Sequence, residues 1–150
     1  MLEEVYNYLH DFGFTSIDLD RIEKENNELF FSSISEVRKN IYFLKENYLE
    51  DTDIIDLIRK NPYILTERTN RIEALDEIYK GVLIIDYESM IELIKNNPET
   101  YTASPVELQK IIDFLKNKKF TIDTIRNLFI KNPKIISMNF ADFEKAIKFN

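Results

Sequence analysis

The dipeptide Asn-Pro occurs three times in the chain, at 61–62, 97–98 and 132–133, so its copies are 36 and 35 residues apart. Each copy follows a short run of apolar residues that ends in one or two charged or amide side chains. Self-similarity at a fixed period of 20–50 residues is typical of solenoids, in which each repeat buries its apolar face against its neighbours. This spacing constrains the fold more than any other feature of the sequence.

The repeat extends well beyond the dipeptide, because apolar residues follow each proline at fixed distances. They lie three, ten and seventeen residues after it, as Leu65, Tyr101 and Ile136, then Ile72, Leu108 and Phe143, then Tyr79 and Leu115. Upstream, Asn27 takes the place of a proline and is followed at the same distances by Phe30, Val37 and Leu44. We therefore predict one helical-repeat domain over 1–150, with a half-unit at 1–13 and repeats at approximately 14–47, 48–81, 82–117 and 118–150.

Each repeat contains two helical patterns, a longer one such as PVELQKIIDFLKNK and a shorter one such as TIDTIRNLFIK. In both, apolar residues recur every three to four positions, as expected for amphipathic helices. Only two glycines and four prolines are present, which argues against an all-β fold with its frequent turns. The predicted fold class is all-α, a right- or left-handed solenoid of about four repeats of ~35 residues, each with two helices and a proline-marked turn.

Capping residues support these helix boundaries. Ser33 with Glu36 and Asn139 with Asp142 have the spacing of N-terminal caps, and Ser104 with Glu107 that of a capping box. The second repeat has Arg68 at this position, and Thr69 is its nearest capping side chain. Between the two helices of each repeat lie residues that tolerate the left-handed conformation at a helix end, namely Gly13, Asn47, Gly81 and Asn117. Each Asn-Pro is expected to end a short helix, because proline cannot continue it.

No residue pattern predicts catalysis, a cofactor or a metal site. There is no cysteine, His10 is the only histidine, and glycines at 13 and 81 alone cannot form a phosphate loop. The acidic stretches 18–28 and 49–56 are interpreted as solvated helix faces, and DTDIID lacks the glycine and terminal glutamate of a calcium loop. We therefore predict a non-enzymatic protein.

Basic residues end the short helices and crowd the last repeat. Residues 109–150 carry a net charge of +5, whereas residues 1–108 carry −12. Cations at helix ends are also favoured by the helix dipole, so their positions alone do not establish a binding role. Repetition would align them in a stripe of the kind that neutralises phosphates. The predicted nucleic-acid-binding residues are Arg59, Lys60, Lys95, Lys116, Lys118, Lys119, Arg126, Lys131 and Lys134.

The proline-anchored spacing resembles that of the mitochondrial transcription termination factor family. Matching residues are Pro62-Leu65-Ile72-Tyr79, Pro98-Tyr101-Leu108-Leu115 and Pro133-Ile136-Phe143, together with the glycine and apolar residue of Gly13-Phe14 and Gly81-Val82. The resemblance covers nearly the whole chain. It implies a superhelical stack of repeats whose concave, positively charged groove binds double-stranded DNA or structured RNA.

Two functions remain open on the sequence. One is nucleic-acid binding, which requires Lys60, Lys95 and Lys131 on one concave face with the lysines of the last repeat. The alternative is a protein-binding adaptor or inhibitor whose acidic surface meets a basic protein, and which mimics the charge of a nucleic acid. We expect a cytoplasmic protein without a membrane span, and self-association through the C-terminal helix, whose apolar pattern stops before its seventeenth position.

Overall fold

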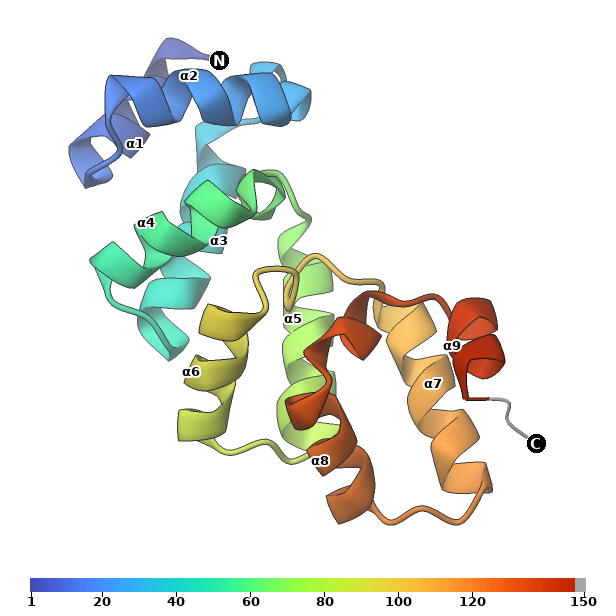
Figure 1. The fold of residues 1–150 in the computed structure, drawn as a ribbon. Helices are drawn as coiled ribbons and strands as arrows, with labels where there is room; N and C mark the ends of the chain where they lie inside the picture. The colour runs from blue at the N-terminus through green and yellow to red at the C-terminus, as the bar shows by residue number, and fades with distance from the viewer. Residues whose placement is uncertain (148–150) are drawn as a thin grey trace. The chain divides into compact units, whose positions relative to one another are not determined.

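The computed structural model describes residues 1–147, with the exception of the Phe30 side chain; the last three positions of the predicted C-terminal helix therefore lie outside the described residues. Its fold is all-α, and the described part contains no strand (Figure 1). The α-helices are α1 (Glu3–Phe12), α2 (Ser16–Glu25), α3 (Ile34–Asn47), α4 (Asp51–Lys60), α5 (Thr69–Glu77), α6 (Tyr87–Asn96), α7 (Pro105–Asn117), α8 (Ile122–Lys131) and α9 (Phe140–Ala146). Shorter segments are the 3-10 turns η1 (Asn27–Phe30), η2 (Pro62–Leu65) and η4 (Pro133–Ser137), and the π-helical turn η3 (Ile78–Val82).

The order of the elements follows the predicted pattern of short helix, tight turn and long helix. The short helices α2, α4, α6 and α8 each have ten residues and end immediately before an asparagine. A 3-10 turn follows α2, α4 and α8, and a hydrogen-bonded turn follows α6. These elements confirm the all-α helical-repeat class, whereas the number of repeats and the hand of the solenoid stay predictions.

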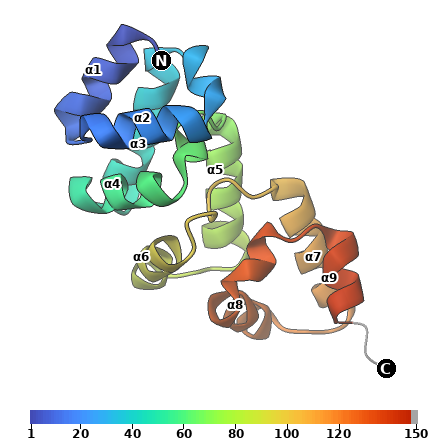
Figure 2. The ribbon, with the colours of Figure 1, turned by 45° about the horizontal axis from the view of Figure 1, so that its top comes forward.

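The chain divides into two compact units, residues 1–72 and 73–150, and the boundary lies within α5. In the first unit, α1 packs on α2 and α3, and α3 packs on α4 (Figure 2). The apolar positions of the helical patterns are buried there, as the repeat predicts. Fully buried members include Val5, Leu9, Ile22, Val37, Ile41, Leu44, Ile54 and Ile58.

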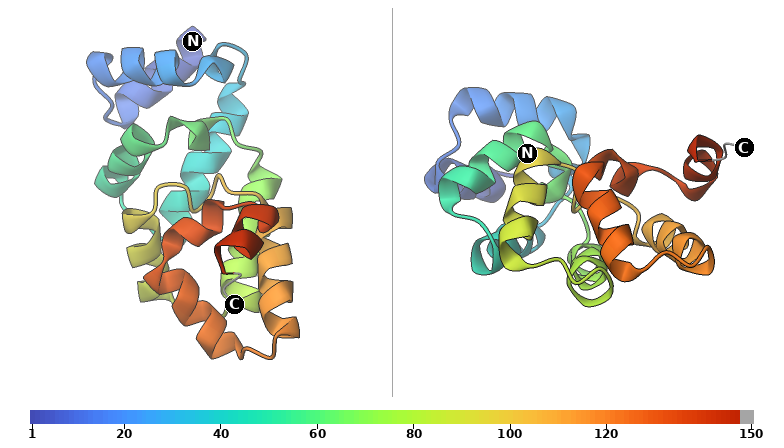
Figure 3. Two further views of the ribbon diagram at one scale, coloured as in Figure 1. Left: turned by 45° about the vertical axis from the view of Figure 1, so that its right-hand side comes forward. Right: turned by 60° about the horizontal axis from the view of Figure 1, so that its bottom comes forward.

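In the second unit, α7 packs against α8 and α9, and α7 and α8 run in opposite directions (Figures 1 and 3). Its core contains two tyrosines of the repeat pattern, Tyr79 and Tyr101, whose rings meet edge to face with centroids 5.8 Å apart. Buried hydroxyls need hydrogen-bond partners. Tyr101 donates to Asp76 Oδ1 at 2.7 Å, and Tyr79 donates to the carbonyl oxygen of Thr100.

The predicted caps are largely confirmed. The side chains of Ser33, Ser104 and Asn139 each accept the N–H three residues on, at the starts of α3, α7 and α9. Glu107, however, does not close a capping box on Ser104, because its Oε1 accepts the N–H of Phe140, the first residue of α9, at 2.7 Å. Glu107 thereby connects α7 to the positive N-terminal end of α9, and this hydrogen bond, followed by that from Lys110, lowers the pKa of its carboxyl group.

Thr69 does not cap α5 either, because it is the first helical residue. Its hydroxyl donates to Asn40 Oδ1 at 2.7 Å. Asn40 is fully buried on α3 and donates to the carbonyl oxygens of Ile64 and Glu67. The threonine therefore completes a buried hydrogen-bond network that the sequence pattern does not predict.

The predicted left-handed positions are wrong in three of four cases. Gly13 has a positive φ of 133°, as predicted. Asn47 and Gly81 do not have a positive φ. The residue that does is Ile84 after Gly81, and Lys119 rather than Asn117 after α7. Asn47 remains helical because its Nδ2 donates to the carbonyl oxygen of Phe43, which satisfies the helix end without a left-handed turn.

Candidate nucleic-acid interface

Arg59, near the end of α4, is held by carboxylates of its own unit. Its guanidinium binds Asp18 on α2 through two parallel hydrogen bonds, Nε to Oδ1 at 3.1 Å and Nη2 to Oδ2 at 2.9 Å, and also pairs with Asp56. The hydrogen bonds from Arg59, and then those from Thr15, lower the pKa of Asp18 to about 2. Arg59 is thus a link between two short helices, and a phosphate would have to compete with Asp18 for it.

Arg126, on α8, is also engaged within its unit. Nη1 donates to the carbonyl oxygen of Leu83 at 3.0 Å, and Nη2 pairs with Asp123 Oδ1 at 2.6 Å. Leu83 precedes Ile84, whose φ is +54°, so this guanidinium stabilises the strained segment before α6. Arg59 and Arg126 therefore both have structural partners within their own units.

Three predicted lysines lie where the C-terminal ends of α6 and α8 meet. Asn97 Nδ2 donates to the carbonyl oxygen of Pro133 at 3.4 Å, which brings these helix ends together. Lys95 lies two residues before Asn97, and Lys131 and Lys134 lie on either side of Asn132-Pro133. All three are exposed, and we call them the corner lysines. Lys60 ends α4 in the first unit, so its alignment with the corner lysines stays a prediction.

The other three lie at the end of α7 and in the turn that follows it, and we call them the turn lysines: Lys116, Lys118 and Lys119. Lys119 has a φ of +73° and donates its N–H to the carbonyl oxygen of Lys116, while Lys118 Nζ lies 5.4 Å from the centre of the Phe114 ring. All three are exposed, and within residues 1–147 none of them forms an ion pair. The turn thus presents three positive charges to solvent without neutralising them.

Phe120 adds an exposed aromatic ring beside the turn lysines. It directly precedes Thr121, the N-cap of α8, just as Phe14 and Leu49 precede the N-caps of α2 and α4. Those two side chains are buried, whereas 49% of Phe120 is exposed. Sequence reasoning missed Phe120 because its register is that of a core residue, and nothing local distinguishes it from Phe14.

The corner lysines and turn lysines lie at opposite ends of α8 (Figure 1). A ten-residue helix is about 15 Å long, so the structure does not gather all six in one cluster. Double-stranded DNA carries one negative charge per about 1.7 Å of its axis, so one duplex could meet both groups.

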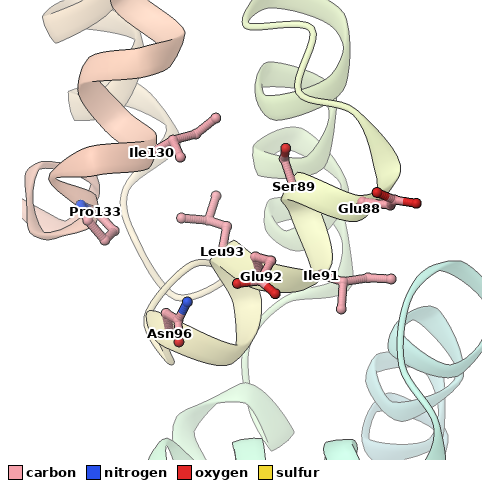
Figure 4. Close-up of a pocket in the computed structure, with 8 residues that line it drawn as sticks. All are labelled: Glu88, Ser89, Ile91, Glu92, Leu93, Asn96, Ile130 and Pro133. Atoms are coloured by element: carbon pink, nitrogen blue, oxygen red, sulfur yellow. The ribbon is translucent and has the colours of Figure 1, made fainter.

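A groove of about 690 Å³ lies along α6 in the second unit and has the opposite polarity (Figure 4). Ile130 and Pro133 line it from the side of α8 and η4, and Leu93 extends from α6 into the same gap. Glu88 and Glu92 are its charged lining residues, and both are exposed. Acidic and basic side chains are therefore separated along α6, with Lys95 at its end.

Comparison with protein families gives a match to the mTERF family model over residues 1–150. The chain belongs to the mTERF family. This match over the whole chain confirms the resemblance to mitochondrial transcription termination factors, a helical-repeat family of nucleic-acid-binding proteins that are generally not enzymes. No curated protein matches the chain.

Two further properties bear on this mTERF-family chain. Within residues 1–147, no helix is long and apolar enough to cross a membrane. The same residues contain no group of three side chains suited to hold a metal ion.

Proposed function

We propose that this mTERF-family protein is a non-enzymatic nucleic-acid-binding repeat module that contacts phosphates through its turn lysines and corner lysines. The single observation that carries the proposal is the turn itself: three exposed lysines without carboxylate partners in the described chain, beside the exposed ring of Phe120. Lysines in such a position release counterions from phosphates on binding, and this release favours association.

The net negative charge of the chain is compatible with this function, because the charge is unevenly distributed. Residues 109–150, which include both lysine groups except Lys95, carry a net charge of +5. Exposed charges farther apart than a Debye length, about 8 Å at physiological ionic strength, are largely screened from one another. The acidic residues of 1–108 therefore weaken nucleic-acid binding most at low salt, and less at physiological ionic strength.

The test is fluorescence anisotropy with a labelled 20-base-pair DNA and a hairpin RNA at several salt concentrations. We expect binding that weakens with salt, and a variant with all three turn lysines changed to alanine should lose about three units of the slope of log K against log salt. The matched control changes Arg68, Lys110 and Lys145, which are exposed elsewhere, to alanine and should keep most of the slope. Equal losses in both variants, or no binding at 50 mM salt, would contradict the proposal.

The acidic groove along α6 favours a second candidate, the docking of a basic segment of a protein. Glu88 and Glu92 would pair with its cations, and Leu93 and Ile130 would contact its apolar side chains. A lysine-rich amphipathic peptide tests this alternative. Its affinity should fall at least tenfold when Glu88 and Glu92 are changed to lysine, and should stay unchanged in the turn-lysine variant.

A further inference from the structure

A second groove, of about 600 Å³, lies between α1 and α3 in the first unit, and we call it the α1–α3 groove. Ile41, which is buried, contributes to its lining. The remaining lining residues are three aromatic and three cationic side chains: Tyr8, Phe12 and Tyr42, and Arg38, Lys39 and Lys45. No acidic side chain is among them.

This composition is unusual for the unit that contains it. Residues 1–72 have nine Lys and Arg and fifteen Asp and Glu, a net charge of −6. One third of the cations of the unit thus line a single groove. Arg38 and Lys39 lie outside the repeat pattern of basic helix ends, so neither the repeat nor the proposed function accounts for these two cations. Lys45 lies in the last turn of α3, at the position that Lys116 has in α7.

Two of the three cations of α3 share one face of the helix with Tyr42. Arg38, Tyr42 and Lys45 follow one another at i, i+4 and i+7, so they form one stripe along the helix. The Arg38 guanidinium carbon lies 5.1 Å from the centre of the Tyr8 ring, a cation–π contact that limits the freedom of the arginine. Partial burial raises the pKa of the Tyr8 hydroxyl, so the phenol remains neutral against this stripe. Lys45 pairs with Asp51 at 3.2 Å, but both side chains are about half exposed and such a pair is weak.

An arginine fixed in this way presents its N–H groups to a carboxylate in a defined direction, at little further entropic cost. Tyr42 is 63% exposed, so its ring is available to an apolar side chain. Tyrosine, arginine and phenylalanine are enriched in protein interfaces and dominate their binding energy. The groove therefore combines apolar area with oriented positive charge.

We propose that the α1–α3 groove docks an acidic amphipathic segment of a partner protein. Carboxylates of the segment pair with Arg38 and Lys45, and its apolar side chains lie against Tyr42 and Phe12. Charge complementarity carries this assignment, because the groove is a basic site on an otherwise acidic unit. The inference goes beyond the proposed function and does not depend on it.

A single-stranded nucleic acid fits the same groove less well. Base stacking needs successive open ring faces, but Arg38 covers a face of Tyr8 and Phe12 packs beside Tyr8 with ring centres 6.4 Å apart. Of the three aromatic side chains, Tyr42 is exposed, whereas Tyr8 and Phe12 are half-buried. The net charge of −6 of this unit also disfavours a nucleic acid, which carries a phosphate at every nucleotide, more than a peptide segment with two or three carboxylates.

The experiment uses the full chain and a displayed library of random 12-residue peptides, selected on the protein and counter-selected on the Arg38→Glu/Lys45→Glu variant. We expect the recovered peptides to be rich in Asp, Glu and large apolar residues. Synthesised with a fluorescent label, they should bind at least tenfold more weakly to the double variant and several-fold more weakly to Tyr42→Ala. The control variant Lys24→Glu/Lys60→Glu, which makes the same charge change at exposed positions of the same unit, should bind within twofold of the wild type.

Circular dichroism of each variant verifies that the helices are retained. The proposal is overturned if the recovered peptides are not enriched in acids, or if the Arg38→Glu/Lys45→Glu variant binds them as the wild type does. It is also overturned if a ten-nucleotide uridine RNA binds in a manner that depends on Arg38 and Lys45 while no acidic peptide does. The turn-lysine variant serves as an internal reference, because it should lose DNA binding but bind the acidic peptides as the wild type does.

Discussion

Asn26 Nδ2 donates a hydrogen bond to the carbonyl oxygen of Pro62 at 3.1 Å, although the two residues are 36 positions apart. Asn97 makes the corresponding bond to the carbonyl oxygen of Pro133, again 36 positions later. In these two cases the asparagine that follows a short helix binds the turn of the following repeat. In contrast, Asn132 is exposed, and its Nδ2 donates to the carbonyl oxygen of Leu128 within its own helix.

We expect Asn26→Ala to lower the free energy of unfolding by about 1–3 kcal/mol, because it leaves the buried carbonyl oxygen of Pro62 and the hydroxyl of Thr66 without this partner. Asn132→Ala should change it by no more than about 0.5 kcal/mol, as is usual for surface substitutions. Urea unfolding followed by circular dichroism gives both values. Similar losses in the two variants would show that the bond between repeats has no special role.

The sequence predicts this helix end but not the bond. Proline excludes the preceding residue from helical geometry, and Asn61, Asn97 and Asn132, which each precede a proline, indeed have a non-helical backbone with ψ between 66° and 92°. This rule is local and can be read from two residues. The partner of the asparagine side chain is a full repeat away, and a pattern of apolar spacing carries no information on it.

The candidate site is predictable to a similar extent. The sequence shows that cations gather in the last repeat, and the turn lysines are exposed as expected. It does not show that Arg59 and Arg126 bind Asp18 and Asp123, since exposed and ion-paired arginines have the same helical register. The exposure of Phe120 is likewise a consequence of packing.

The two glycines should respond differently to substitution. Gly13→Ala places a side chain at φ +133° and its Cβ 2.8 Å from Ile55 Cδ1, so we expect the free energy of unfolding to fall by about 1–3 kcal/mol. Gly81 has no positive φ, and its Cβ would meet only the flexible carboxylate of Glu77, so Gly81→Ala should lie within about 1 kcal/mol of the wild type. Thermal unfolding of both variants tests the difference. An equally destabilised Gly81→Ala would contradict it.

Phe14 and Phe120 occupy the same place before a short helix but differ in burial. Phe14→Ala should lower the free energy of unfolding by about 3–5 kcal/mol, because Phe14 is only 2% exposed and removal of its ring leaves a cavity. Phe120→Ala should lower the free energy of unfolding by less than about 1 kcal/mol, because Phe120 is already 49% exposed. If Phe120 takes part in nucleic-acid binding, the same variant lowers the affinity for DNA or RNA while the urea midpoint stays nearly constant. A large loss of stability in Phe120→Ala would contradict the exposed position of the ring.

The bond between Arg59 and Asp18 should make stability depend on pH in a defined window. The folded-state pKa of Asp18, about 2, lies below its ordinary value of 3.8, mainly because Arg59 donates to the ionised carboxylate. The unfolded chain therefore binds the proton more readily, and the stabilisation is complete above pH 4, falls as the pH drops from 4 to 2, and is absent below that. Urea unfolding at pH 6, 4, 3 and 2 should show a difference between the wild type and Asp18→Asn that shrinks across this window. Asp20→Asn changes an exposed position of the same helix and is the matched control, which should show no such trend. If the difference for Asp18→Asn stays constant with pH, the carboxylate charge does not stabilise the contact between α2 and α4.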